Sequence, residues 1–222
     1  MGFSDELRQT VANMWDREKQ HPFVTGIGDG TLELERFRYY MRQDYVFLID
    51  FCRAISLGTA KVKDVGDMGW FAKLLHDTLN TEMALHISFC ADLGISEAEL
   101  RSTEPSPTTL AYTRHLLQTG YSAGIGEIAS SILPCSWGYA EIGVMLADRG
   151  TPESQPLYGR WIDMYSAPEF AELANWLRSF VDRTAEGCGD VELTRMERAF
   201  VTSSQYEYMF WDAAYRMEQW PV

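Results

Sequence analysis

A proline and a cysteine stand side by side within a helical pattern, in the stretch SSILPCSWGYAEIG, residues 130–143. A proline inside a helix lacks an amide hydrogen, and its ring clashes with the carbonyl four residues earlier, here that of Ser130. We therefore expect a kink or a broken turn at Pro134. Cys135 follows directly, and Tyr139 lies four residues later, so the thiol and the phenol share one helix face. Two interpretations are open: Cys135 is a reactive thiol at an irregular point of the backbone, or it is a buried core thiol, a common fate of cysteine.

Apolar residues recur at helical spacing along almost the whole chain, and no segment predicts a strand. We expect an all-α fold of about eight helices joined by short loops. Ser4 and Thr31 are the expected N-caps of the first two helices, with a turn at Gly26–Gly30 between them, and Gly94 is the expected end of the third helix. The expected helices cover residues 4–19, 31–61, 66–93, 109–120, 125–148, 158–165, 168–186 and 190–218.

The length of 222 residues fits a single domain, because single hydrophobic cores extend to roughly 250 residues. Hydrophobic residues make up 46 % of the chain and charged residues 23 %, which is ordinary for a globular protein. No repeat, linker or low-complexity tract interrupts the pattern. We expect one domain spanning residues 1–222.

The net charge of −13 restricts the possible partners. Nucleic acid and anionic membrane surfaces would be repelled, so neither is expected as a partner, whereas a small neutral or cationic ligand is easier to accommodate. The N-terminal segment MGFSDEL carries acidic residues where a signal peptide needs a basic end, and no apolar run approaches the ~18 residues that span a bilayer. These features lead us to expect a soluble, cytoplasmic protein.

Two carboxylates lie among apolar neighbours at helical spacing. Asp44 is flanked at three and four residues by tyrosine, methionine, phenylalanine and leucine, and Glu207 lies in the aromatic segment SSQYEYMFWD, residues 203–212. A carboxyl group in such surroundings tends to have a raised pKa, which suits general acid–base catalysis. The alternatives are a salt bridge between Asp44 and a neighbouring basic residue and a solvent-facing position for Glu207.

The spacing of histidines and cysteines does not favour a metal site. Di-iron bundles need Glu-x-x-His on two helices, and Glu18 with His21 is the one such match, at a helix end beside Pro22. The four cysteines are scattered singly, without the short spacings typical of zinc ligands. Nothing selects a histidine as a haem ligand. We therefore expect neither a metal nor a cofactor.

Three segments in this order resemble the TenA/thiaminase II family: residues 130–143, the segment WIDMYSAPEF at 161–170, and residues 203–212. The resemblance extends over nearly the whole chain and includes the segment RQDY around Asp44. It implies a haem-oxygenase-like all-α fold without haem, a homotetramer, and a cytoplasmic role in thiamin salvage. The implied enzyme is an aminopyrimidine aminohydrolase.

The family's reaction is hydrolytic removal of the group on the 5-methylene of a 4-amino-2-methylpyrimidine, either an amine or the thiazole of thiamin, to give hydroxymethylpyrimidine. The resemblance implies that Cys135 is the nucleophile at the ring carbon next to a ring nitrogen, that Glu207 protonates that nitrogen, and that Asp44 holds the 4-amino group. Protonation makes the ring more electrophilic, and a thiolate is a strong nucleophile near neutral pH. The substrate-lining positions implied by the resemblance are Tyr112, Tyr139, Tyr165 and Phe210.

Phe47 departs from the family pattern, in which many members carry a tyrosine that contacts the substrate. The missing hydroxyl leaves the choice between aminomethylpyrimidine and thiamin open. Two other functions compete with hydrolysis: a non-catalytic pyrimidine-binding or regulatory protein, and an iron-dependent redox enzyme of the same fold. Turnover separates the hydrolase from the binder, and metal analysis tests the redox enzyme.

Overall fold

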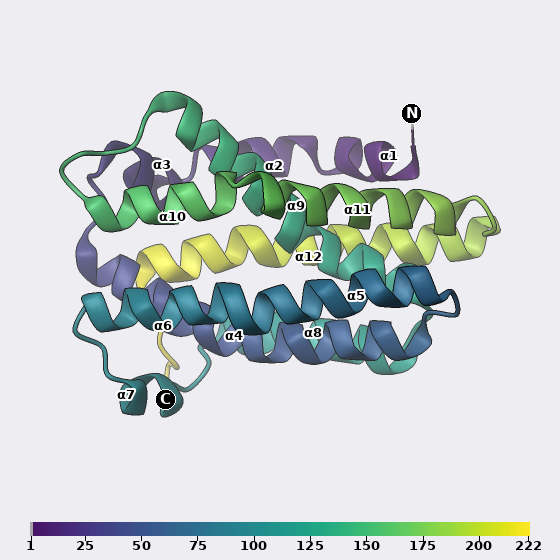
Figure 1. Ribbon diagram of the computed structural model, residues 1–222, viewed down its shortest axis with the longest axis horizontal. Coiled ribbons are helices and arrows are strands. Elements are labelled where there is room, and N and C mark those ends of the chain that lie inside the picture. Colours follow the sequence, from purple (N-terminus) through teal and green to yellow (C-terminus); the bar gives the residue numbers. More distant parts are fainter. Residues whose placement is uncertain (1) are drawn as a thin grey trace. The chain divides into compact units, whose positions relative to one another are not determined.

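The computed structural model describes residues 2–222, and within this range it contains twelve α-helices and one π-helical segment (Figure 1). The expected all-α fold is confirmed, whereas the expected number of about eight helices is too small. Backbone contacts divide the chain into two compact units. The first unit consists of the described residues up to Leu32 together with Gly126–Trp211, and the second unit consists of Glu33–Ile125 and Asp212–Val222.

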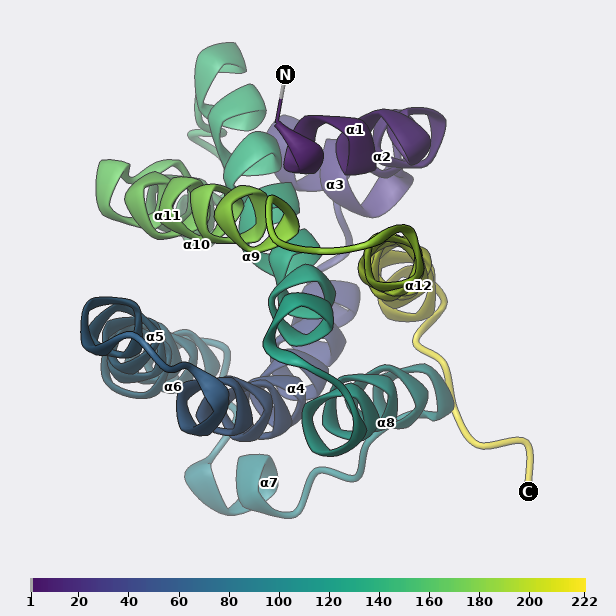
Figure 2. The same cartoon turned by 90° about the vertical axis from the view of Figure 1, so that its right-hand side faces the viewer.

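The first unit is built from short N-terminal helices and four longer ones. Helix α1 packs against α11, and α10 packs against both α3 and α11. In Figure 2, α10 lies behind α11. An aromatic core fills this unit, in which the Tyr139 ring lies 4.8 Å from that of Tyr165 and 5.0 Å from that of Trp211. The helices are α1 (Phe3–Thr10), α2 (Ala12–Lys19), α3 (Pro22–Asp29), α9 (Ile125–Arg149), α10 (Pro156–Ser166), α11 (Pro168–Ala185) and α12 (Asp190–Arg216), the last as far as Trp211.

The second unit is organised around its longest helix, α4, which packs against α5, α6 and α8. Helices α5 and α6 follow one another in a single rod with the π-helical turn η1 between them (Figure 1). The elements are α4 (Leu34–Lys61), α5 (Val65–Asp77), η1 (Thr78–Glu82), α6 (Met83–Asp92), α7 (Glu97–Arg101) and α8 (Pro107–Ser122).

The N-terminal segment departs from the expected single helix. The helix is interrupted at Val11, so Ser4 is not an N-cap but lies inside α1, where its amide and hydroxyl bind Asp182. Buried Leu7, Val11 and Trp15 keep helical spacing across the interruption, which is why the apolar pattern did not reveal it.

The segment after Pro22 is a helix, where the sequence predicted a turn. Proline is favourable at the first helical position, because its missing amide would be unbonded there, and Pro22 begins α3 in this way. Gly30 ends α3 with φ = 70°, a left-handed conformation that suits glycine. Thr31 is not the N-cap of α4, because its amide bonds the Gly26 carbonyl at the end of α3. The N-cap of α4 is Glu33.

The third expected helix contains a π-helical turn, so it is not one regular helix. Five residues, Thr78–Glu82, form this turn between α5 and α6. Gly94 follows α6 with φ = 73°, as expected for a helix terminator. The next long helix begins at Pro107, and its N-cap is Ser106, whose hydroxyl accepts the Thr109 amide.

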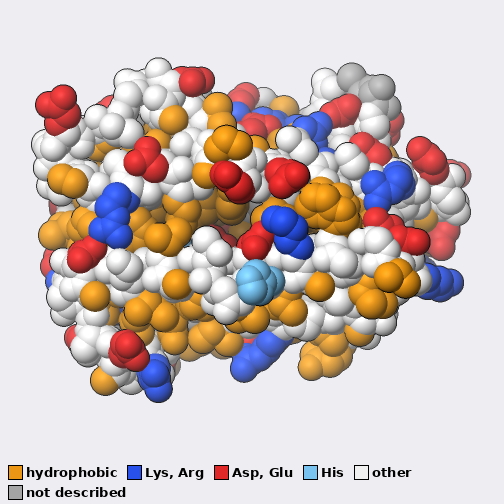
Figure 3. Space-filling model, viewed as in Figure 1, with side chains coloured by type: hydrophobic (Ala, Val, Ile, Leu, Met, Phe, Trp, Pro, Cys, Tyr) orange, Lys and Arg blue, Asp and Glu red, His pale blue; other side chains and the backbone are white. Residues whose placement is uncertain are grey.

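Helix α9 continues through Pro134 from Ile125 to Arg149, so the broken turn expected there is wrong. Pro134 is buried, as are Leu133 and Ser136, and the surrounding packing holds the helix together despite the missing amide. Among residues 2–222, no helix is both long enough and apolar enough to cross a membrane. On the face shown in Figure 3, lysine and arginine side chains stand apart from one another among acidic and apolar ones.

Gly143 allows α9 and α10 to approach closely, and this contact can be tested by substitution. A Cβ at Gly143 would lie 2.4 Å from the carbonyl carbon of Tyr165, and a backbone atom cannot move aside as a flexible side chain can. We expect Gly143→Ala to lower the free energy of unfolding by about 1–3 kcal/mol, measured by denaturant unfolding.

Gly138→Ala is the matched control, because Gly138 is buried on the same helix and has nothing within 4 Å of the added Cβ. Its expected effect is neutral or a stabilisation of up to ~1 kcal/mol from helix propensity. Equal effects of the two substitutions would contradict a steric role for Gly143.

Candidate active site

The eight side chains expected at the site fall into two groups, one in each compact unit. The first unit holds Cys135, Tyr139, Tyr165, Glu207 and Phe210, and the second unit holds Asp44, Phe47 and Tyr112. The structure brings side chains together within each group, as described below.

Cys135 differs from the two core cysteines in its exposure. Cys135 is half-buried on α9, whereas Cys52 and Cys90 are only 4 % and 0 % exposed. Burial raises the pKa of Cys52 to about 12 and that of Cys90 to about 11, so both remain protonated near neutral pH. The interpretation of Cys135 as a fully buried core thiol is therefore wrong.

Tyr139 lies one helical turn after Cys135 and belongs to an aromatic cluster. Its ring lies close to those of Tyr165 and Trp211, and Tyr165 is held in turn by Trp161 at 4.6 Å and Phe170 at 5.1 Å. Such packing fixes ring orientation, because interlocked aromatic side chains have few alternative rotamers. The cluster therefore gives the face of α9 that carries Cys135 rigid surroundings.

Glu207 is buried on α12, with 4 % of its surface exposed, so the solvent-facing alternative is wrong. Its helix face also carries Ser203, Phe210 and Trp211, which are all buried. Helix α12 is held in register against α2 by a hydrogen bond of 3.1 Å from Trp15 Nε1 to Ser204 Oγ. A carboxyl group among such neighbours can exchange a proton with a bound ligand shielded from water.

In the second unit, Asp44 forms a buried pair with His86. The distance from His86 Nε2 to Asp44 Oδ2 is 2.6 Å, and the two side chains are 0 % and 5 % exposed. His86 Nδ1 lies 2.9 Å from the Glu82 carbonyl. Because both nitrogens face oxygen acceptors, the ring donates from both and carries a positive charge.

The charge state of this pair follows from two opposing effects. Burial disfavours the charged imidazole, but the charge of Asp44 and its hydrogen bond outweigh burial, so the pKa of His86 is raised above its ordinary value. Asp44 thus forms a salt bridge, which was the alternative left open by its sequence context. Its partner is His86, which the sequence analysis did not identify as such. The sequence feature that could have pointed to His86 is its position four residues after Glu82. Glu82 is the last residue of the π-helical turn.

Phe47 and Tyr112 contact each other in the second unit, with ring centroids 4.9 Å apart. Phe47 also stacks on Phe51 at 5.5 Å, and Phe47 and Tyr112 are 3 % and 1 % exposed. Both positions are therefore fixed by packing. Within residues 2–222, the structure contains no group of three or more histidine, cysteine, aspartate or glutamate side chains placed to hold a metal ion.

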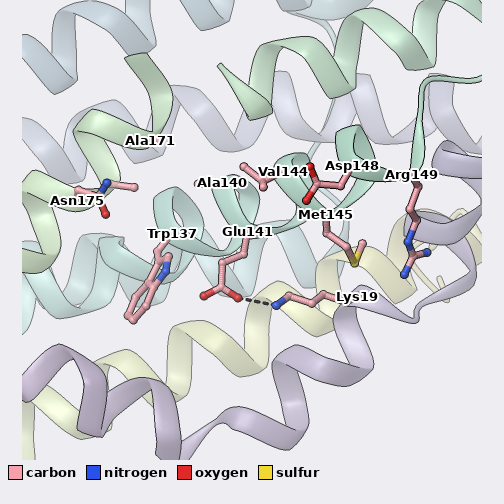
Figure 4. A pocket seen from close by; sticks show the side chains of 11 residues that line it. Lys19, Trp137, Ala140, Glu141, Val144, Met145, Asp148, Arg149, Ala171 and Asn175 are labelled. Atoms are coloured by element: carbon pink, nitrogen blue, oxygen red, sulfur yellow. Dashed lines mark hydrogen bonds and ion pairs between the residues drawn. The ribbon is translucent and has the colours of Figure 1, made fainter. Parts of the chain in front are cut away.

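A surface groove of about 620 Å³ lies on a different face of α9 (Figure 4). It is lined by Trp137, Glu141 and neighbouring residues of α9, by α11, and by Lys19, which forms an ion pair of 2.6 Å with Glu141. Successive residues of a helix are 100° apart, so Cys135 and Tyr139 point to the opposite side from this groove. The groove is therefore separate from the candidate active site.

The helical arrangement defines a known fold class. A solved domain from Shewanella denitrificans OS217, described as having a heme oxygenase-like fold, matches with a TM-score of 0.74 at 18 % identity, covering 96 % of this chain and 92 % of that chain. The TenA homologue protein from P. horikoshii OT3 matches with a TM-score of 0.89 at 30 % identity, covering 97 % and 99 % of the two chains. The heme oxygenase-like fold expected from the resemblance is confirmed.

Within that class, the chain belongs to the TENA/THI-4/PQQC family, whose model matches residues 8–217. The curated relatives include an aminopyrimidine aminohydrolase from Halalkalibacterium halodurans, 43 % identical over 220 residues. That match covers 99 % of this chain and 98 % of the relative. The family resemblance inferred from the three sequence segments is thereby confirmed.

The buried ion pair predicts a specific dependence of stability on pH. Because the pKa of His86 is raised in the folded state, its contribution is fully present below the ordinary value of 6.5 and is lost as the pH rises through the raised value. We expect His86→Gln to lower the free energy of unfolding by about 3–5 kcal/mol at pH 6, and by less at pH 9. Denaturant unfolding at a series of pH values measures both.

His76→Gln is the control, since His76 is exposed on α5 in the same helical rod. Its expected effect is within about 0.5 kcal/mol at either pH. An equal loss at pH 6 and pH 9 in His86→Gln would contradict a charged His86.

Proposed function

We propose that this chain is an aminopyrimidine aminohydrolase, a thiaminase II that hydrolyses 4-amino-5-aminomethyl-2-methylpyrimidine to the hydroxymethyl product in thiamin salvage. The observation that carries the proposal is the 43 % identity over 220 residues to an enzyme with that name. The half-buried thiol beside an aromatic cluster and the buried carboxyl group of Glu207 support it, because the reaction needs a nucleophile and an acid.

In the proposed mechanism, Glu207 gives its proton to a ring nitrogen while the Cys135 thiolate forms a bond to the adjacent ring carbon. The electron pair that enters the ring then expels the protonated amine from the 5-methylene group as ammonia. Water adds to that methylene carbon and gives a proton to Glu207. Departure of the thiolate, and loss of the proton on the ring nitrogen to the released ammonia, restore the aromatic ring. The burial of Glu207 supports this role, because a proton transfer shielded from water needs little solvent reorganisation.

Asp44 has the proposed role of accepting hydrogen bonds from the 4-amino group of the pyrimidine. Its pair with His86 supports this role, because a carboxylate paired with an imidazole accepts hydrogen bonds through its oxygens. The pair also occupies one carboxylate oxygen, Oδ2, which fixes how the side chain is oriented. The proposed substrate-lining roles of Tyr112, Tyr139, Tyr165 and Phe210 rest on the family resemblance.

Phe47 bears on which leaving group the enzyme prefers. Its ring packs against Phe51 and Tyr112, so this position offers an apolar surface without a hydrogen-bond donor. Rates with aminomethylpyrimidine and with thiamin, measured side by side, identify the better substrate.

The family resemblance also supports a cytoplasmic homotetramer composed of single-domain subunits. The match of one family model to residues 8–217, across both compact units, supports the single domain. Sedimentation equilibrium of the purified protein tests the tetramer.

The first test of the mechanism is ammonia release from aminomethylpyrimidine. We expect Cys135→Ala to lower kcat by about 10³-fold or more, because the covalent route is lost, and Glu207→Gln to lower it by about 10²–10⁴-fold. Cys188→Ala is the matched control, since Cys188 is also half-buried but its thiol donates to the Thr184 carbonyl. This control is expected to retain wild-type activity.

Inactivity of the wild type toward both aminomethylpyrimidine and thiamin would refute the proposed function. In that case, calorimetric binding of the pyrimidine product to wild type and to Cys135→Ala tests the alternative. Similar affinities without turnover would identify a non-catalytic pyrimidine-binding protein of the same fold.

A further inference from the structure

Glu18 is a buried glutamate on the short helix α2, whose other buried residue is Trp15. It is 2 % exposed, although its neighbours Asp16 and Arg17 are exposed, and its Oε1 atom is buried without a hydrogen-bond partner. A buried polar atom of this kind costs free energy unless it has a function or a partner that arrives later. The mechanism proposed above does not use Glu18.

Contacts between α2 and α12 place Glu18 beside Glu207. Trp15 donates to Ser204 Oγ at 3.1 Å, and two residues later Arg17 donates to the Tyr208 hydroxyl at 3.1 Å. The two helices therefore run in the same direction. One turn beyond Trp15 on α2 is Glu18, and one turn beyond Ser204 on α12 is Glu207.

The charges around Glu18 favour its protonated form. Burial raises the pKa of the Glu18 carboxyl well above its ordinary value, and the charge of Glu207 raises it further. The charge of Glu141 on α9 acts in the same direction, whereas Arg8 on α1 and Lys19 lower the pKa.

The two cations near Glu18 are themselves engaged. Arg8 and Lys19 form ion pairs with Glu141 at 3.1 and 2.6 Å, which weakens their effect on Glu18. His21, at the start of α3, accepts the Phe23 amide through Nδ1. That nitrogen therefore carries no proton, so the ring is not doubly protonated. Glu18 and Glu207 are thus two buried acids on corresponding turns of adjacent helices.

We propose that Glu18 and Glu207 form a carboxyl pair that shares one proton at neutral pH, and that Glu18 is a positioning residue that keeps this proton available to Glu207. The proposal rests on the function proposed above. Two facing carboxylates in a buried site cannot both ionise readily, so the pair retains one proton and one negative charge.

The proton balance of the catalytic step follows directly. The O–H bond of the pair breaks, its electrons remain on the carboxylate, and an N–H bond forms on the pyrimidine. The total charge of the pair and the substrate does not change. The pair regains a proton from the attacking water, and the proton on the pyrimidine nitrogen passes to the released ammonia when the thiolate leaves, so no additional reactant is required.

The first test is the pH dependence of kcat/KM for ammonia release in the wild type, Glu18→Gln and Asp16→Asn. Without a facing carboxylate, Glu207 loses its proton more easily, so in Glu18→Gln the basic limb should move to lower pH by on the order of one unit. The KM at the pH optimum should change little. Asp16→Asn removes the same charge from an exposed position of the same helix, and its profile should match that of the wild type. A Glu18→Gln profile that superimposes on the wild-type profile would overturn the proposal.

A second test does not depend on turnover. Because the pKa of Glu18 is raised in the folded state, the wild type should lose stability relative to Glu18→Gln as the pH rises above the ordinary value of 4.5. Asp16→Asn should show no such trend. In the Glu207→Gln background, the pH-dependent difference should become smaller, because the two groups are coupled. A difference that is independent of pH, or unaffected by Glu207→Gln, would overturn the pair.

Infrared spectra of the wild type provide a test that needs no Glu18 variant. A protonated carboxylic acid should be visible at neutral pH in the wild type and lost at high pH, and Glu207→Gln should alter its band. Absence of such a band would overturn the proposal. If the stability and infrared results hold but neither pyrimidine is turned over, the proposed function fails while the carboxyl pair stands.

Discussion

The burial of carboxyl groups among aromatic side chains is the constraint on which this structure depends most. Asp44 and Glu207 are 3 % and 4 % exposed, in helices whose buried faces are otherwise mostly apolar. Removing a carboxylate from water is costly unless a cation, a hydrogen bond or a proton compensates for it. The two compact units provide this compensation in different ways. His86 forms an ion pair with Asp44, whereas we propose that Glu207 shares a proton with Glu18.

These two solutions suit different chemical tasks. A carboxylate in an ion pair can accept hydrogen bonds, which is what recognition of an amino group requires. A carboxyl group facing another acid holds a proton that it can release, which is what an acid catalyst requires. The aromatic packing contributes by fixing positions, since Tyr139 is held between Tyr165 and Trp211 and Gly143 lets α10 approach α9. The structure thus separates a fixed charge from an exchangeable proton.

The sequence was sufficient to predict the fold class, and the three segments around Cys135, Tyr165 and Glu207 were sufficient to predict the family. Its failures lay where tertiary contacts override local preference. The helix expected to end at Lys19 does end there, but Pro22 then begins α3, which covers most of the turn expected at residues 26–30. Pro134 was interpreted as a helix breaker, whereas packing carries α9 through it. His86 and Glu18 were missed because the burial of one polar residue depends on a distant helix. The periodicity of one helix contains no information about the distant helix that packs against it.

The contrast between the cysteines shows why the site residues were harder to predict than the fold. Cys52, Cys90 and Cys135 all occupy helical segments rich in apolar residues, and apart from the family resemblance the sequence left the reactive and the buried interpretations of Cys135 both open. In the structure, burial raises the pKa of the first two thiols to about 12 and 11, whereas Cys135 retains partial exposure one turn before Tyr139. Thiolate formation depends on solvation and on nearby donors. Reactivity is therefore a property of the packed helices, and the thiol best suited to it lies on the helix face that also carries the fixed aromatic cluster.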